Sequence, residues 1–137
     1  MLSSQEVITY ELKMLQKMQQ IHTLANTLAA SHALKSLIAN QIIRLDELES
    51  HLLSLSSQRG WDVPDFPSFM KLLTRLHFRR ENDPSIAENL IYSYTDVTIE
   101  IRKRYNQWYQ NDTAAQNLTQ KFLDCCEAGI RQMQQFL

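Results

Sequence analysis

Four segments of this chain carry apolar residues in alternating steps of three and four, and this spacing constrains the fold more than any other feature. Such steps keep side chains on one face of an α-helix. The segments span residues 4–30 and 33–57, a third that starts at Asp83, and a fourth from residue 113 onward. Each helix can bury its apolar stripe only against the others, so the pattern predicts an all-α fold, a four-helix bundle.

Each row of seven residues shares one face of its predicted helix. One charged residue, Glu11, interrupts the first row. In the fourth helix, the neighbouring apolar residues Leu123, Cys126, Ile130 and Met133 widen the stripe. The rows are Val7, Glu11, Met14, Met18, Ile21, Ala25 and Leu28; Leu34, Ile38, Gln41, Leu45, Leu48, Leu52 and Leu55; Ala87, Leu90, Tyr94, Val97, Ile101, Arg104 and Trp108; and Ala115, Leu118, Phe122, Cys125, Gly129, Gln132 and Phe136.

Capping residues mark where the helices begin. Ser3 and Glu6 have the spacing of a capping box at the start of the first helix. Asp83, followed by a proline, is expected to cap the third helix. Thr113 and Gln116 have the spacing of a second capping box, at the start of the fourth.

The connection between the second and third helices is long, whereas the other two are short. Residues 59–67 contain a glycine and two prolines, which exclude a regular helix. Trp61 and Phe66 in this stretch predict a loop held onto the end of the bundle. Residues 68–79 are expected to form a short extra helix. Two hairpins joined by a crossover are typical of ferritin-like bundles; a simple up-down bundle is the alternative.

Length and charge limit the class of protein. The 137 residues suit a single helical domain, residues 1–137, and the formal net charge of −1 argues against nucleic acid as a partner. No apolar run is long enough to predict membrane insertion. The N-terminal stretch lacks the pattern of a signal peptide, so a cytoplasmic location is expected.

A dinuclear metal site in such a bundle requires two glutamates and two Glu-x-x-His pairs that point inward. The nearest candidates are Glu11, Glu49, His51 and Glu88, but no Glu-x-x-His pair is present. The sequence therefore favours no bound metal and no other cofactor. Instead, the Glu11 carboxylate is expected to reach solvent or to bond Tyr94 or Gln41, and its burial without a cation would raise its pKa.

Nucleophilic and redox chemistry receive little support. Cys125 and Cys126 are adjacent, so they are expected to form neither an internal disulfide nor a zinc site. The sequence leaves crosslinks between chains through these thiols as an alternative. His22 and His51 flank their rows and are expected at the boundary of the core. We find no phosphate loop or nucleophile elbow, so the chain is expected not to be an enzyme.

Aromatic residues gather at the end of the third helix. Tyr105, Trp108 and Tyr109 fall within five residues and cannot all face inward. Together with Trp61 and Phe66 they are the candidate interaction residues. Coverage of this end by the Trp61 loop is the alternative.

Several short stretches carry a family resemblance. They are residues 83–88 (DPSIAE), 111–112 (ND) and 127–137 (EAGIRQMQQFL), with looser agreement at 21–25 (IHTLA) and 59–61 (RGW). In these the chain resembles the coat protein F-like family, ferritin-like bundle proteins of spore-forming Gram-positive bacteria. The resemblance implies a four-helix fold, production during sporulation and deposition in the spore coat. It implies no catalytic residue.

These observations predict a structural protein that acts by protein association, with itself or with other coat proteins. Two alternatives remain open. One is a divergent ferritin-like metalloprotein that uses Glu11, and the other is a small regulatory adaptor that uses the aromatic end of the third helix.

Overall fold

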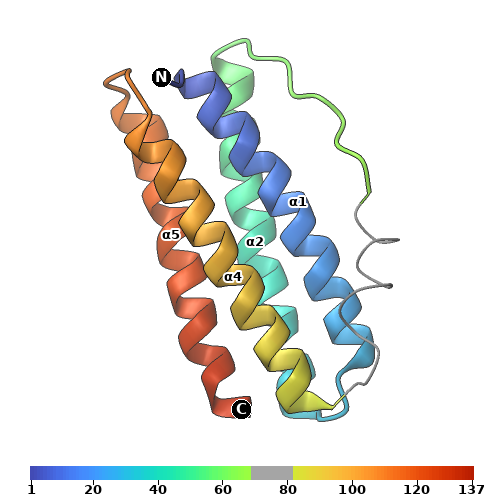
Figure 1. Cartoon of the computed structure of the whole chain (residues 1–137). Coiled ribbons are helices and arrows are strands. Elements are labelled where there is room, and N and C mark those ends of the chain that lie inside the picture. The colour runs from blue at the N-terminus through green and yellow to red at the C-terminus, as the bar shows by residue number, and fades with distance from the viewer. Residues whose placement is uncertain (69–81) are drawn as a thin grey trace.

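The computed structural model describes residues 1–68 and 82–137. In these ranges four long helices pack against one another as an all-α four-helix bundle (Figure 1), as predicted. The short helix expected at 68–79 falls almost wholly outside the described residues. The elements are α1 (Ser4–Leu28), α2 (His32–Gln58), α4 (Asp83–Asn106), α5 (Thr113–Met133) and a final 3-10 turn, η1 (Gln134–Phe136).

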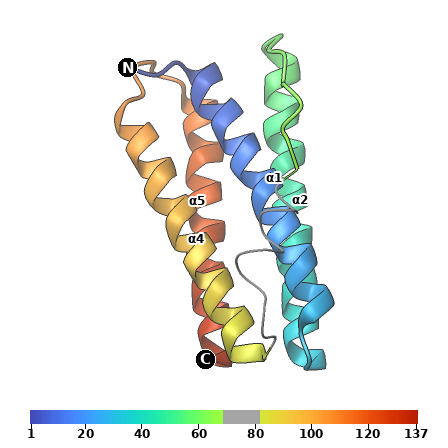
Figure 2. The ribbon, with the colours of Figure 1, turned by 45° about the vertical axis from the view of Figure 1, so that its right-hand side comes forward.

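The two hairpins are joined so that every adjacent pair of helices is antiparallel. The guanidinium of Arg59, just after α2, pairs with Asp112 between α4 and α5. Asp83, at the start of α4, instead accepts hydrogen bonds from the backbone of Ala30 and Ser31, between α1 and α2. Helix α4 therefore starts at the end of the bundle opposite to where α2 finishes (Figures 1 and 2). This is the one-crossover connectivity, and not the simple up-down bundle.

The helix starts agree with the sequence at α1 and differ at α4 and α5. Ser3 and Glu6 form the predicted capping box. Asn82 caps α4 in place of Asp83, because the Asp83 carboxylate is already bonded to the α1–α2 turn. Asp112 caps α5 in place of Thr113, and its carboxylate accepts the Ala115 N–H at 3.3 Å.

The predicted rows of α1, α2 and α4 face the core, apart from a few half-buried members. Every residue of the α2 row is buried. Met14, Leu28 and Arg104 are half-buried, and Trp108 lies beyond the end of α4. Apolar residues of all four helices build two clusters, one toward each end of the bundle.

The predicted row of α5 is displaced by one residue from the buried side of the helix, although three of the residues predicted to widen its apolar stripe, Leu123, Cys126 and Met133, are buried. Thr119, Cys126 and Met133 are buried. The residues one position earlier, which were predicted to be buried, are only half-buried. The predicted row and the observed buried row share Ala115, Phe122 and Gly129, which are buried. The two rows differ in the rotation of α5 about its axis, and in the structure Thr119 points toward Glu11.

The segment after α2 is held against the bundle, as predicted. Gly60 adopts a φ of 70°, which only glycine adopts readily, and ends the helix. Trp61, Val63 and Phe66 then pack against the core. None of the described helices is long and apolar enough to cross a membrane.

Candidate functional site

Glu11 lies in the interior of the bundle with no exposed surface. The hydroxyl of Thr119, on α5, donates to its Oε2 at 2.7 Å, whereas its Oε1 has no hydrogen-bond partner within the described residues. Desolvation raises the Glu11 pKa to about 8, against the opposing effect of the Thr119 bond. The predicted rise is confirmed, but the predicted partners, Tyr94 and Gln41, are wrong. At neutral pH this side chain is mostly a neutral carboxylic acid.

Tyr94 instead bonds a different buried group, the imidazole of His22, and Gln41 lies beside both of them. The Nδ1–H of His22 donates to the Met18 carbonyl at 2.7 Å, so Nε2 is free to accept from the Tyr94 hydroxyl at 2.8 Å. That hydroxyl also lies 2.9 Å from Oε1 of Gln41, whose amide donates to Gln132. The network ties all four helices together. The expectation that His22 lies at the core boundary is wrong.

Burial lowers the His22 pKa to about 4, and the Met18 carbonyl and the Gln41 Oε1, two acceptors that favour the protonated ring, only partly offset this effect. The ring is therefore neutral at physiological pH. Burial also raises the pKa of Tyr94, so its hydroxyl remains a donor. These groups, like Glu11, are absent from the linings of the principal surface cavities of the described chain. Their hydrogen bonds connect the helices to one another.

The candidate metal ligands are not brought together. Glu11 is buried, Glu49 is half-buried, and His51 and Glu88 are exposed. Among residues 1–68 and 82–137, no group of three His, Cys, Asp or Glu side chains is arranged to hold a metal ion.

The two cysteines are free thiols, with Cys126 buried and Cys125 half-buried. Burial raises the pKa of both, so they are mostly protonated at neutral pH. Cys125 and His51 line the same shallow cavity of about 320 Å³ between α2 and α5. A protonated thiol is a weak nucleophile, and this arrangement gives little support to covalent catalysis.

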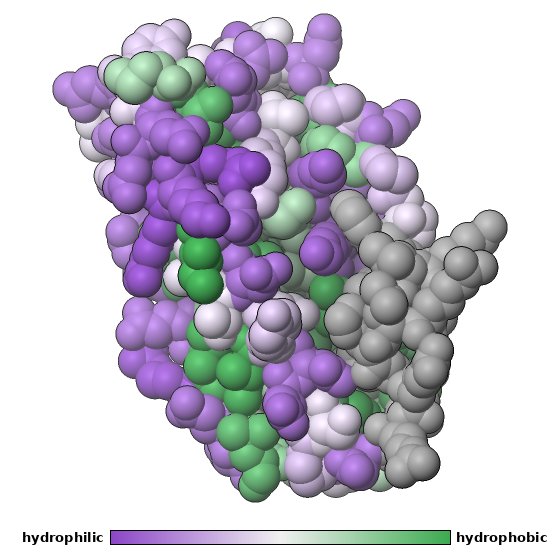
Figure 3. Space-filling model, in the orientation of Figure 1, coloured by the Kyte–Doolittle hydropathy of each residue, from purple (hydrophilic) through white to green (hydrophobic). Residues whose placement is uncertain are grey.

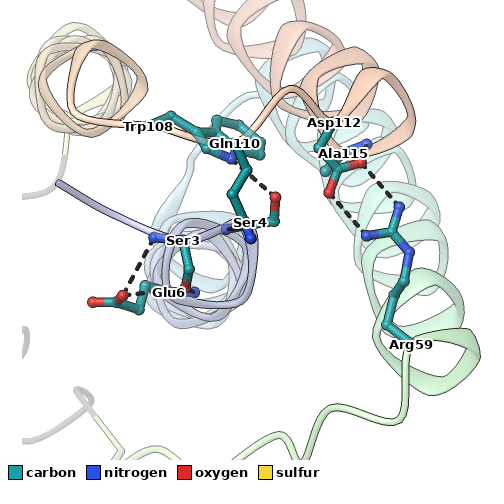
Figure 4. A network of polar contacts seen from close by, with 8 residues as sticks. All are labelled: Ser3, Ser4, Glu6, Arg59, Trp108, Gln110, Asp112 and Ala115. Atoms are coloured by element: carbon teal, nitrogen blue, oxygen red, sulfur yellow. Dashed lines mark hydrogen bonds and ion pairs between the residues drawn. The ribbon is translucent and has the colours of Figure 1, made fainter.

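The bundle end near the N-terminus is closed by a polar network (Figure 4). The Leu2 N–H donates to the Gln107 carbonyl at 2.7 Å, and the Ser4 N–H donates to the Gln110 side chain at 2.7 Å. On the other side of this end, Arg59 and Asp112 form a bidentate ion pair at 2.8 and 2.9 Å. The guanidinium holds the Asp112 pKa well below its usual range.

The five candidate interaction residues divide into two groups. Trp61, Phe66 and Trp108 pack against the core, and the Trp108 indole N–H donates to the Ser4 hydroxyl at 3.0 Å. Tyr105 and Tyr109 are exposed, with the Tyr105 ring edge-on to Trp108. The first group therefore packs against the bundle, and the two tyrosines are the exposed members of the five.

Phe66 also borders an open groove of about 700 Å³ between α1 and residues 62–66. Tyr10 lies in the same groove, and the guanidinium carbon of Arg104 stands 3.3 Å above the centre of its ring. This contact joins α4 to α1 through a cation–π interaction.

Comparison with protein-family models, with curated proteins and with solved structures finds no match. The function is therefore inferred from the interior and the surface of this chain.

Sequence reasoning missed Thr119 and Gln132 as polar partners. A second row in α5, with Thr119, Cys126 and Met133, has the same regular spacing as the chosen one. A buried carboxyl group on one helix calls for a donor on another, so a threonine in that second row was the available signal.

Proposed function

We propose that this chain is a non-enzymatic bundle protein that acts by associating with other protein chains. One observation carries the proposal: large apolar side chains are exposed on α4 and directly after it, namely Tyr92, Ile99, Tyr105 and Tyr109. Exposed aromatic residues are enriched at protein interfaces. Meanwhile Glu11 and His22, the buried ionisable groups, are engaged in bonds between helices.

The resemblance of residues 83–88 and 127–137 to the coat protein F-like family suggests the setting for this association. We propose the spore coat, reached after synthesis in the cytoplasm of the sporulating cell. Partners in that layer are other coat proteins or further copies of this chain. A rigid bundle with an apolar outer face is suited to such a packed protein layer.

Fractionation of the source cells through sporulation tests the setting. An antibody against the chain is expected to detect it in coat extracts of purified spores, at a higher level than in the vegetative soluble fraction. Detection in the vegetative fraction alone would contradict a role in the spore.

Elemental analysis tests the metalloprotein alternative. Protein purified without chelator is expected to contain far less than one iron or manganese per chain. A stoichiometric metal, lost in a Glu11→Gln variant, would contradict the proposed non-enzymatic role.

A surface variant tests the adaptor alternative. Tyr109→Ala is the suitable probe because Tyr109 is exposed, whereas Trp108→Ala would also remove the indole bond to Ser4. If coat proteins bind through this end, Tyr109→Ala is expected to reduce their co-purification and leave the helical content unchanged.

A further inference from the structure

The outer face of α4, defined by Tyr92, Asp96, Ile99 and Lys103, carries an apolar centre that the rest of the described chain leaves open. Steps of four, three and four place these residues on one side of the helix. Tyr92 is 72% exposed and Ile99 is 48% exposed. Figure 3, in which α4 lies toward the viewer, shows hydrophobic residues among hydrophilic ones over α4 and the adjoining part of α5.

The charges on this face follow an order along the helix. Asp96 precedes Ile99 by three residues and Lys103 follows it by four, so opposite charges stand at nearly equal distances from the isoleucine. Asp96 forms no ion pair within the described residues. Lys103 has a contact of 3.3 Å with Glu100 one turn away, and because both side chains are solvated this pair is weak.

This order makes the outer face of α4 complementary to itself in one orientation. If two copies of α4 pack antiparallel about a two-fold axis at Ile99, each Asp96 lies opposite the other copy's Lys103. A parallel arrangement would instead place like charges together. Isologous two-fold contacts of this kind are the commonest way in which identical chains associate.

We propose that a second copy of this chain docks antiparallel on the outer face of α4, with the two Ile99 side chains at the centre and reciprocal Asp96–Lys103 ion pairs on either side. The inference rests on the proposed function and deepens it by naming one partner. A single helix face is small beside the interfaces of permanent dimers, so the dimer is weak and reversible. Its exposed ion pairs also make it sensitive to salt.

Sedimentation velocity over a range of protein concentrations, at low and high salt, provides the test. Asp96→Lys alone and Lys103→Asp alone each place like charges across the axis. Each is expected to raise the dimer dissociation constant by about tenfold or more at low salt. An equimolar mixture of the two variants restores both attractive pairs. It is expected to form a heterodimer at the protein concentrations at which the parent chain dimerises.

Matched variants separate this geometry from other contacts. Ile99→Asp is expected to abolish the dimer, while Ile43→Asp, at an exposed isoleucine of α2, leaves it intact. Circular dichroism of every variant checks that the helices are retained. A monomeric parent at all concentrations overturns the proposal, as does a dimer that Asp96→Lys does not weaken or a mixture that stays monomeric.

The results distinguish the absence of this dimer from the absence of the proposed role in the spore coat. If the parent is monomeric but the chain is found in coat extracts, its association is with other proteins. If the chain is absent from the coat but the charge-swapped variants pair as expected, the dimer holds and the setting is wrong.

Discussion

At the scale of single residues, the buried carboxyl group of Glu11 sets the response of stability to alkaline pH. Its pKa is about 8 in the folded chain against an ordinary 4.5, so the folded state keeps a proton that the unfolded state releases. The contribution of Glu11 to the free energy of unfolding therefore falls as pH rises from 4.5 to about 8, and it is constant above that range. Between pH 6.5 and 9 we expect urea denaturation to show a loss on the order of a few kcal/mol.

A Glu11→Gln variant is expected to lose this dependence, because the amide does not ionise. Glu127→Gln, at an exposed position of α5, is the control and should keep the parent slope. A parent chain whose unfolding free energy is constant from pH 6.5 to 9 would show that Glu11 reaches water or a cation.

The imidazole of His22 gives the opposite response at acid pH. Its pKa is about 4 in the folded chain against an ordinary 6.5, so the unfolded state binds a proton that the folded state excludes. The contribution of His22 to stability is therefore lost as pH falls from 6.5 toward 4. In NMR spectra, the His22 ring signals are expected to stay constant between pH 8 and about 5. A titration midpoint near 6.5 would contradict its burial.

At the scale of elements, the approach of α4 to α5 depends on the absence of a side chain at Gly129. A Cβ at this position would lie 2.5 Å from Cζ of Tyr94 and 2.6 Å from its Cε2. Tyr94 is fully buried and bonded to His22, so its ring cannot move away freely. The glycine therefore sets the distance between the two helices.

Gly129→Ala is expected to destabilise the fold, as judged from urea midpoints. Overpacking of this kind costs about 1–3 kcal/mol, which exceeds the gain of about 1 kcal/mol from the higher helix propensity of alanine. Asn117→Ala, at an exposed position of α5, serves as the control and should be neutral or stabilising. A more stable Gly129→Ala chain would show that the ring has room to shift.

At the scale of the whole molecule, polar contacts at each end fasten the two hairpins together. Asp83 bonds the turn between α1 and α2, and at the other end Arg59 pairs with Asp112 between α4 and α5. These contacts join segments 53 residues apart in the chain. They favour the crossover connectivity, because α2 finishes beside the turn that leads into α5.

Asp112 has two roles at its end of the bundle, and a double-mutant cycle separates them. Asp112→Ala removes both the α5 cap and the ion pair, so we expect a larger fall in melting temperature than for Arg59→Ala. The cap alone contributes about 1 kcal/mol. Once Asp112 is replaced, adding Arg59→Ala is expected to change little. Additive effects would show that the pair does not couple the hairpins.

Much of the fold could be predicted from residues that are close together in the sequence. The rows of α1, α2 and α4, the Ser3 capping box and the irregular stretch after Gly60 all depend on spacings within one helix or turn. The rotation of α5 could not be read, since its two candidate rows are equally regular. The positions of the caps at α4 and α5 shifted by one residue because Asp83 and Asp112 also bond distant segments.

The spacing of apolar residues is enough to predict four amphipathic helices with an apolar interior, because helix periodicity is a local property. The tertiary structure decided which polar groups meet inside. Glu11 and Thr119 are 108 residues apart, and His22 and Tyr94 are 72 apart. Nothing near either residue in sequence specifies its partner, since that choice depends on how far each helix turns about its axis when the four pack together.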